Sequence, residues 1–139
     1  MTDISKKEIQ TRKKIELHSD CTHWKSTLHF IGDELIFIDN LLSSYIFEPN
    51  TPNLFERLLD YQNRLKKIKI KKAKVGHKIE LHEKSLGGIL DCLDDACDLR
   101  FYQSHSALEA EVVGFSEKFQ NLKGEIFNYA GGILKKNKN

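Results

Sequence analysis

The side chains best suited to chemistry in this sequence are histidines and carboxylates that fall in three separate stretches of the chain. Imidazole nitrogens and carboxylate oxygens bind divalent metals, and helical bundles build metal sites from such side chains on facing helices. His105 and Glu109 are one helical turn apart, so on a helix they would offer two ligands on one face. The candidate metal ligands are Asp20, His23, Glu34, His82, His105 and Glu109.

Several of these residues also have an ordinary structural interpretation. His82 and His105 interrupt stripes of apolar residues, where a hydrogen-bonded core histidine is commoner than a metal ligand. Glu34 lies within the apolar arc of its helix. It either leans to the edge and pairs with a lysine, or it is a buried carboxylate that must be paired, protonated or metal-bound. The paired Glu-x-x-His segments of ferritin-like sites are absent. A divalent metal, iron or zinc, is therefore the alternative to a protein without a cofactor.

The sequence contains none of the short motifs that mark common enzyme classes. It has no glycine-rich dinucleotide fingerprint, no phosphate-binding loop and no His-Glu-x-x-His zinc motif. His82-Glu83 comes closest, but the residues that follow are Lys84, Ser85 and Leu86. We therefore expect neither a conventional hydrolase or kinase nor a dinucleotide-dependent enzyme, and we favour a protein that is not an enzyme.

Apolar residues at alternating steps of four and three indicate the helices that must position these side chains. This heptad spacing is typical of helices that pack lengthwise against other helices. The longest run lies between residues 54 and 93, and only Lys72 and His82 break its apolar character. Its members are Leu54, Leu58, Tyr61, Leu65, Ile68, Lys72, Val75, Ile79, His82, Leu86, Ile89 and Leu93.

Three runs of this kind predict an all-α protein, an antiparallel helical bundle of three long helices. The chain of 139 residues is expected to be a single helical domain. Residues 1–18 are charged and weakly periodic, so we expect them to be frayed or to form a short, loosely packed helix. Residues 135–139 are expected to be a solvated tail. The predicted helices cover residues 19–47, 53–92 and 99–134.

Local signals set the predicted helix ends. Ser19 and Asp20 are good N-cap residues for the first helix, and Pro49 ends it because proline cannot continue the hydrogen-bond ladder. A lone glycine costs only about 1 kcal/mol relative to alanine, so Gly76 is expected to leave the second helix continuous. If the helix breaks at Gly76, the chain would instead form a four-helix up-down bundle.

A short turn between antiparallel helices brings residues equidistant from the turn to the same level, so residue x of the first helix faces roughly residue 100 − x of the second. This rule gathers the histidines at one end of the bundle. It also leaves the second and third helices as a bare hairpin, with Leu86 and Leu108 exposed. Such a surface favours self-association. We therefore expect a non-enzymatic interaction or scaffold module that forms homo-oligomers or binds a protein partner, with a metal-binding bundle as the alternative.

Composition gives little reason to expect a nucleic-acid or membrane partner. The formal net charge is +2, and the lysines of residues 66–78 project all round their helix without interleaved aromatic side chains. No run of about 18 apolar residues occurs, and the first residues lack the apolar core of a signal peptide. We expect a cytoplasmic protein in which Cys21, Cys92 and Cys97 are thiols, with a Cys92–Cys97 disulfide as the alternative.

Several short strings resemble a family of small bacterial helical-bundle proteins with no assigned activity. The resemblance covers the first predicted helix and part of the second. It implies a helical fold, and it carries no activity or site residue to this chain. The strings are Leu17-His18-Ser19-Asp20, Trp24, Asp33-Glu34-Leu35, His82-Glu83-Lys84 and Leu86-Gly87-Gly88.

Overall fold

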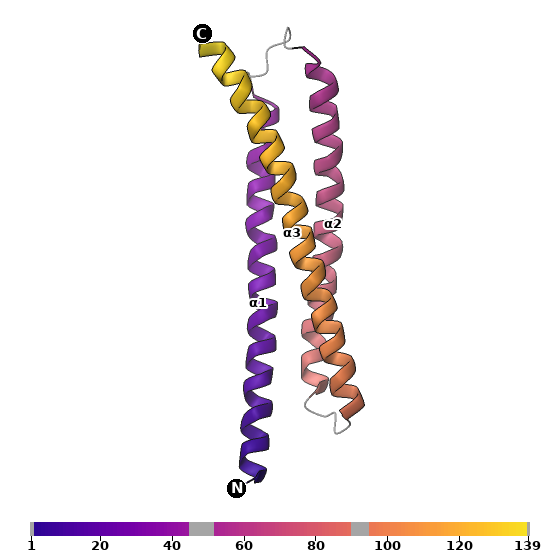
Figure 1. Cartoon of the computed structure of the whole chain (residues 1–139). Coiled ribbons are helices and arrows are strands. Elements are labelled where there is room, and N and C mark those ends of the chain that lie inside the picture. Colours follow the sequence, from indigo (N-terminus) through magenta and orange to yellow (C-terminus); the bar gives the residue numbers. More distant parts are fainter. Residues whose placement is uncertain (1, 45–51, 90–94, 139) are drawn as a thin grey trace.

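The computed structural model is an up-down-up bundle of three long helices (Figure 1). The helices are α1 (Thr2–Leu42), α2 (Leu54–Ile89) and α3 (Asp95–Lys138). The described residues are 2–44, 52–89 and 95–138. Among them there is no strand, and the predicted all-α bundle of three helices is confirmed. In this part of the chain, no helix combines the length and the hydropathy that crossing a membrane requires.

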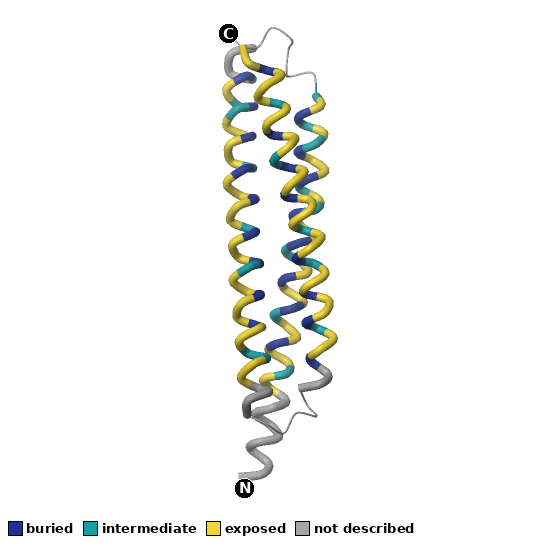
Figure 2. Tube along the Cα trace, turned by 90° about the vertical axis from the view of Figure 1, so that its right-hand side faces the viewer, coloured by how far each residue is buried: buried dark blue, intermediate teal, exposed yellow. Residues whose placement is uncertain are grey.

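Each helix buries one stripe of side chains that faces the other two helices (Figure 2). The stripes follow the alternating steps of four and three, because this spacing keeps side chains on one side of a helix over many turns. Among the described side chains of α1, from residue 12 onward, the buried ones are Leu17, Cys21, Trp24, Leu28, Ile31, Leu35, Ile38 and Leu42. The corresponding stripes of α2 and α3 include His82 and His105.

The α2 helix is continuous through Gly76, so the four-helix alternative is wrong. A Cβ atom at Gly76 would be in ordinary contact with Leu28, and the helix packs across this point without a break. At its start, Asn53 has a φ of 57°, a left-handed conformation that asparagine adopts more readily than most residues. The Asn53 carbonyl accepts a hydrogen bond from the N–H of Arg57 at 3.0 Å.

The α1 helix begins at Thr2, and the predicted start at Ser19 or Asp20 is therefore wrong. Leu17 and Cys21 continue the buried stripe toward the N-terminus and belong to one apolar cluster with Leu86 and Leu108. The longer α1 thus covers the second and third helices where we expected a bare hairpin. Leu86 and Leu108 are buried, so the predicted exposed surface for self-association does not exist there.

The other helix ends also differ from the predictions. α1 ends at Leu42, before the expected end near residue 47. α3 begins at Asp95 and continues to Lys138, so residues 135–138, expected to be a solvated tail, are helical. Cys92 and Cys97, expected to be thiols with a disulfide between them as the alternative, lie outside the described side chains.

Lys72 divides the apolar core into two clusters along the bundle axis. On α2 one cluster ends at Ile68 and the other begins at Val75, with Lys72 between them. The Lys72 side chain passes over Gly32 of α1, where an added Cβ atom would lie 3.1 Å from the lysine Cε. The lysine Nζ would lie 3.3 Å from the same atom, so glycine at position 32 leaves room for the end of the Lys72 side chain against α1.

Ion pairs between helices mark the register of the bundle. Lys25 of α1 contacts Glu83 of α2 at 2.8 Å, whereas the rule based on a short turn placed Lys25 beside Val75. The register of α1 against α2 therefore differs from the prediction by up to two turns. Because α1 ends at Leu42 and α2 begins at Leu54, the connection is longer than a tight turn, and side-chain packing sets the register instead.

A buried cysteine and histidine cluster as a candidate metal centre

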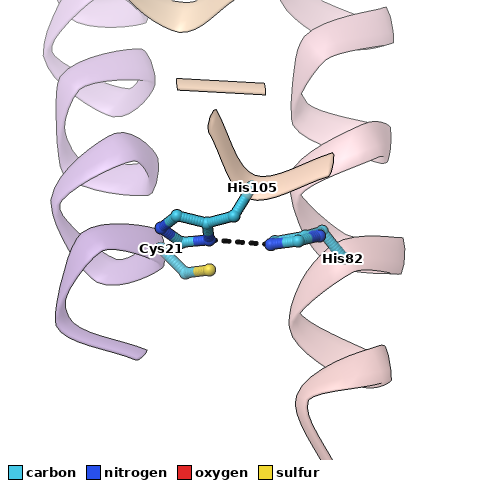
Figure 3. Close-up of side chains that lie close together, drawn as sticks. All are labelled: Cys21, His82 and His105. Atoms are coloured by element: carbon cyan, nitrogen blue, oxygen red, sulfur yellow. Dashed lines mark hydrogen bonds between the residues drawn. The ribbon is translucent and has the colours of Figure 1, made fainter. Parts of the chain in front are cut away.

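Cys21, His82 and His105 point toward one another from three different helices (Figure 3). The Cys21 sulfur and one ring nitrogen from each histidine all lie within 4.8 Å of one another. The three residues are 0%, 9% and 5% exposed, respectively. A thiol and two imidazoles are thus concentrated in the interior of the bundle, where polar groups are stable only with partners.

The heptad spacing explains why these three side chains meet. Cys21 continues the buried stripe of α1, and His82 and His105 occupy stripe positions on α2 and α3. A side chain at such a position is directed toward the axis of the bundle, whatever its chemistry. The three helices therefore each deliver one potential ligand to the same level.

A chain of hydrogen bonds fixes the orientation of His105. Its Nε2 lies 2.9 Å from Oδ2 of Asp20, and because a carboxylate only accepts hydrogen bonds, this nitrogen carries the proton. The other nitrogen of neutral His105, Nδ1, then has a free lone pair. It accepts a hydrogen bond from Nε2 of His82 at 2.8 Å. Asp20 thus turns an electron-pair donor of His105 toward Cys21 and His82.

Aromatic rings enclose the two imidazoles. Phe101 stacks on His82 with ring centroids 4.5 Å apart and an interplanar angle of 18°. The Trp24 ring centroid lies 4.7 Å from that of His105. Both contacts restrict rotation of the imidazoles and keep water away from them, so the cluster is pre-organised and has a low local dielectric constant.

Burial controls the protonation states of His82 and Cys21. Desolvation lowers the pKa of His82, and the neighbouring His105 lowers it further, which favours a neutral ring with a lone pair. Desolvation raises the pKa of the Cys21 thiol, and the charges of Glu83 and Asp20 add to this effect. A thiol with a raised pKa is a poor nucleophile. The arrangement therefore does not support covalent catalysis by Cys21, whereas a metal ion could displace the thiol proton.

The distances in the cluster suit a small metal ion after minor side-chain movements. Zinc binds sulfur at about 2.3 Å and imidazole nitrogen at about 2.0–2.1 Å, so ligand atoms around a tetrahedral ion lie about 3.5 Å apart. The two histidine nitrogens, at 2.8 Å, would have to separate by less than about 1 Å. Asp20 could stay bonded to His105, as carboxylates commonly do behind histidines that bind metals.

The structure brings four of the six predicted ligands together. Asp20, His105 and Glu109 have ligand atoms within 4.8 Å of one another, and His82 joins them through His105. His23 is exposed and belongs to no group of potential ligands among the described residues.

Glu34 lies about 20 Å from Asp20 along α1, since fourteen residues of helix separate them. There it forms an ion pair with Lys123 of α3. This is the lysine pairing that was one of our two interpretations of Glu34, and it leaves the carboxylate far from the cluster.

Sequence reasoning missed Cys21 as a candidate ligand. The signal was present, because Leu17, Cys21, Trp24 and Leu28 follow the steps of four, three and four. We placed the start of the first helix at Ser19 or Asp20, so Cys21 fell in a first turn and was considered only as a thiol.

No known family model, curated protein or solved structure matches this chain. The resemblance to small bacterial helical proteins therefore remains a prediction, and the argument for function depends on the cluster itself.

Proposed function

We propose that the protein is a metal-binding helical bundle in which Cys21, His82 and His105 hold one zinc ion. The observation that carries this proposal is the orientation of His105. Its Nε2 is bonded to Asp20 and its Nδ1 is directed toward the other two candidate ligands. A carboxylate that fixes a histidine in this way is the usual support of a zinc-binding imidazole.

The chemistry of the donor atoms favours zinc over iron, calcium or magnesium. One thiolate and two imidazoles form a nitrogen and sulfur set that suits zinc, whereas hard cations prefer oxygen ligands. Three protein ligands leave the fourth position of a tetrahedral ion for water or another small ligand. Among functions that need such a centre, we propose reversible metal binding for sensing or storage.

The first experiment is thermal unfolding of the full chain with and without zinc. Binding to the folded state alone should raise the melting temperature, in proportion to the logarithm of the zinc concentration. His105→Gln should abolish the increase, whereas His77→Gln, at an exposed position of α2, should retain it. The increase should fade below about pH 6, because protons compete with the metal for histidine nitrogens. An unchanged melting temperature in saturating zinc would contradict the proposal.

As a second candidate, we propose that the bundle is an interaction module that self-associates through exposed aromatic residues of α1 and α3. Phe37 and Phe127 meet edge to face with ring centroids 6.2 Å apart, yet they remain 59% and 38% exposed. Phe30 lies two turns from Phe37 on α1 and is also exposed. Exposed aromatic surface of this kind favours burial against a second copy of the chain.

Light scattering tests this second candidate directly. The wild type should be larger than a monomer at micromolar concentration, and Phe37→Ser with Phe127→Ser should release monomers. Phe55→Ser is the matched control, because Phe55 is exposed on α2. A monomeric wild type would rule out self-association.

A further inference from the structure

A groove between α2 and α3 combines a basic rim with an apolar floor, and it shares no residue with the Cys21 cluster. It encloses about 670 Å³, within the range of small-molecule sites. Its floor includes Ile68 and Phe115, which belong to the apolar core, and Ile70, which is half-exposed. Ile70 is 54% exposed, whereas Ile68 and Phe115 are 4% and 5% exposed, so among these three residues Ile70 supplies most of the apolar surface that the floor presents to solvent.

The basic residues of the rim form a line along α2. Arg64, Lys67, Lys71 and Lys74 follow at steps of three, four and three, so they lie on one side of the helix, facing the groove. Lys118 contributes a cation from the α3 side. Other lysines of residues 66–78 project from other sides of α2. The basic residues of the rim nevertheless concentrate positive charge around the apolar floor.

The charges of the rim are only partly neutralised by the protein. Glu111 accepts hydrogen bonds from Lys71 at 2.9 Å and from Lys78 at 3.0 Å. Arg64 is paired with Glu125 at 2.7 Å. Within the residues that the structure describes, Lys67, Lys74 and Lys118 have no ion-pair partner. Three cations therefore remain available to an anion bound in the groove.

Gly114 keeps the α3 side of the groove open. An added Cβ atom at this position would meet no heavy atom within 4 Å, so the space is not filled by neighbouring side chains. A larger side chain at position 114 should therefore obstruct the groove without disturbing the apolar core.

We propose that this groove binds a free medium-chain fatty acid, with its carboxylate on the lysine rim and its hydrocarbon chain on the apolar floor. The line from Arg64 to Lys74 spans ten residues of helix, or about 15 Å, which suits a single extended hydrocarbon chain. A docked helix would need a longer row of exposed apolar anchors than Ile70 and its neighbours provide. The unpaired lysines supply the charge complementarity that selects an anion.

Isothermal titration calorimetry of the full chain with dodecanoate, below its micelle concentration, tests the proposal. We expect one site per chain, with affinity that falls as salt is added. Gly114→Leu should weaken binding at least tenfold by occupying the groove. Gly124→Leu is the matched control, since Gly124 is also an exposed α3 glycine with open space but does not line the groove. Circular dichroism and melting temperature establish that both variants are folded.

A charge control completes the experiment. Changing Lys67, Lys74 and Lys118 together to glutamine should weaken dodecanoate binding at least tenfold, whereas Lys66→Gln with Lys84→Gln, outside the groove, should not. Dodecyltrimethylammonium, which has the same chain and a positive head, should not bind in the groove. The proposal is overturned if dodecanoate does not bind, if Gly114→Leu binds it as well as the wild type, or if the cationic amphiphile binds equally. Exclusive binding of an acidic helical peptide in the groove would also overturn it.

Discussion

Nε2 of His82 donates a hydrogen bond to Nδ1 of His105 across the interface between α2 and α3, at 2.8 Å. These two nitrogens are the same atoms that a metal would use, and in the metal-free protein they satisfy each other. For a metal to bind both, the proton of His82 would have to move from Nε2 to Nδ1. Zinc fingers unfold without their ion because little else holds them together. Here two apolar clusters extend along the bundle. We therefore expect the metal-free protein to remain helical, with the ion adding stability.

Asp20→Asn should weaken zinc binding about 10- to 100-fold, the usual effect of removing a carboxylate behind a metal-binding histidine. The amide can donate a hydrogen bond to Nε2 of His105, which would place the proton on Nδ1 and remove its lone pair. Competition with a chromophoric chelator measures the affinity. Asp33→Asn is the matched control, because Asp33 is exposed on the same helix. Equal affinities of the two variants would show that Asp20 does not position the ligand.

His82 should make the metal-free bundle less stable as the pH falls. Its pKa is lowered in the folded state, so the unfolded chain binds the proton first. Its contribution to stability is complete above the unfolded pKa of about 6.5 and declines as the pH falls from there through the lower folded pKa. His82→Gln should therefore reduce the slope of unfolding free energy between pH 7.5 and 5.5, measured in urea. A His82→Gln slope equal to that of the wild type would contradict this assignment, and so would an equal reduction in His77→Gln, at an exposed position of α2.

Leu17→Ala should destabilise the bundle by about 2–4 kcal/mol, the usual range for a buried leucine. Leu17 is 6% exposed, whereas Ile15, two residues earlier, is 62% exposed and serves as the control through Ile15→Ala. Urea unfolding measures both. If residues 1–18 were frayed or loosely packed, as we first expected, the two substitutions would have similarly small effects, and the cover of α1 over Leu86 and Leu108 would be disproved.

Lys123→Met should cost about 1–3 kcal/mol, because it leaves the largely buried Glu34 carboxylate without its cation. Glu34 Oε1 already has no hydrogen-bond partner, so the remaining oxygen depends on Lys123. Replacing Glu34 by glutamine in the same chain should recover part of the loss, as measured by urea unfolding. Absence of any coupling between the two positions would show that the pair is merely a surface contact.

The heptad pattern predicted much of this fold because it reports burial directly. A stripe of apolar residues has to be covered, and three long stripes on successive helices have few arrangements. The continuity of α2 through Gly76 followed from the small cost of a single helical glycine. Counting along α2 and α3 from the turn between them places His82 near Leu108, between His105 and Glu109, which is close to its observed contact with His105.

The N-terminal part and the register of α1 could not be predicted in the same way. Charged residues surround Leu17, and good N-cap residues at Ser19 and Asp20 suggested a helix start that packing overrides. Tertiary contacts decide such boundaries more strongly than local signals do. This error concealed Cys21, the third member of the cluster, and produced a false exposed surface at Leu86 and Leu108.

Cobalt substitution tests the central claim most directly, because cobalt bound to a thiolate gives a charge-transfer band in the near ultraviolet. The measurement uses the full chain with Cys92→Ser and Cys97→Ser, so that Cys21 is the one remaining thiol. We predict that the band saturates at one cobalt per chain, is abolished by added zinc, and is lost in a further Cys21→Ala variant that remains helical. A cobalt titration without a thiolate band, or with a band that persists after Cys21→Ala, would contradict the proposed metal centre.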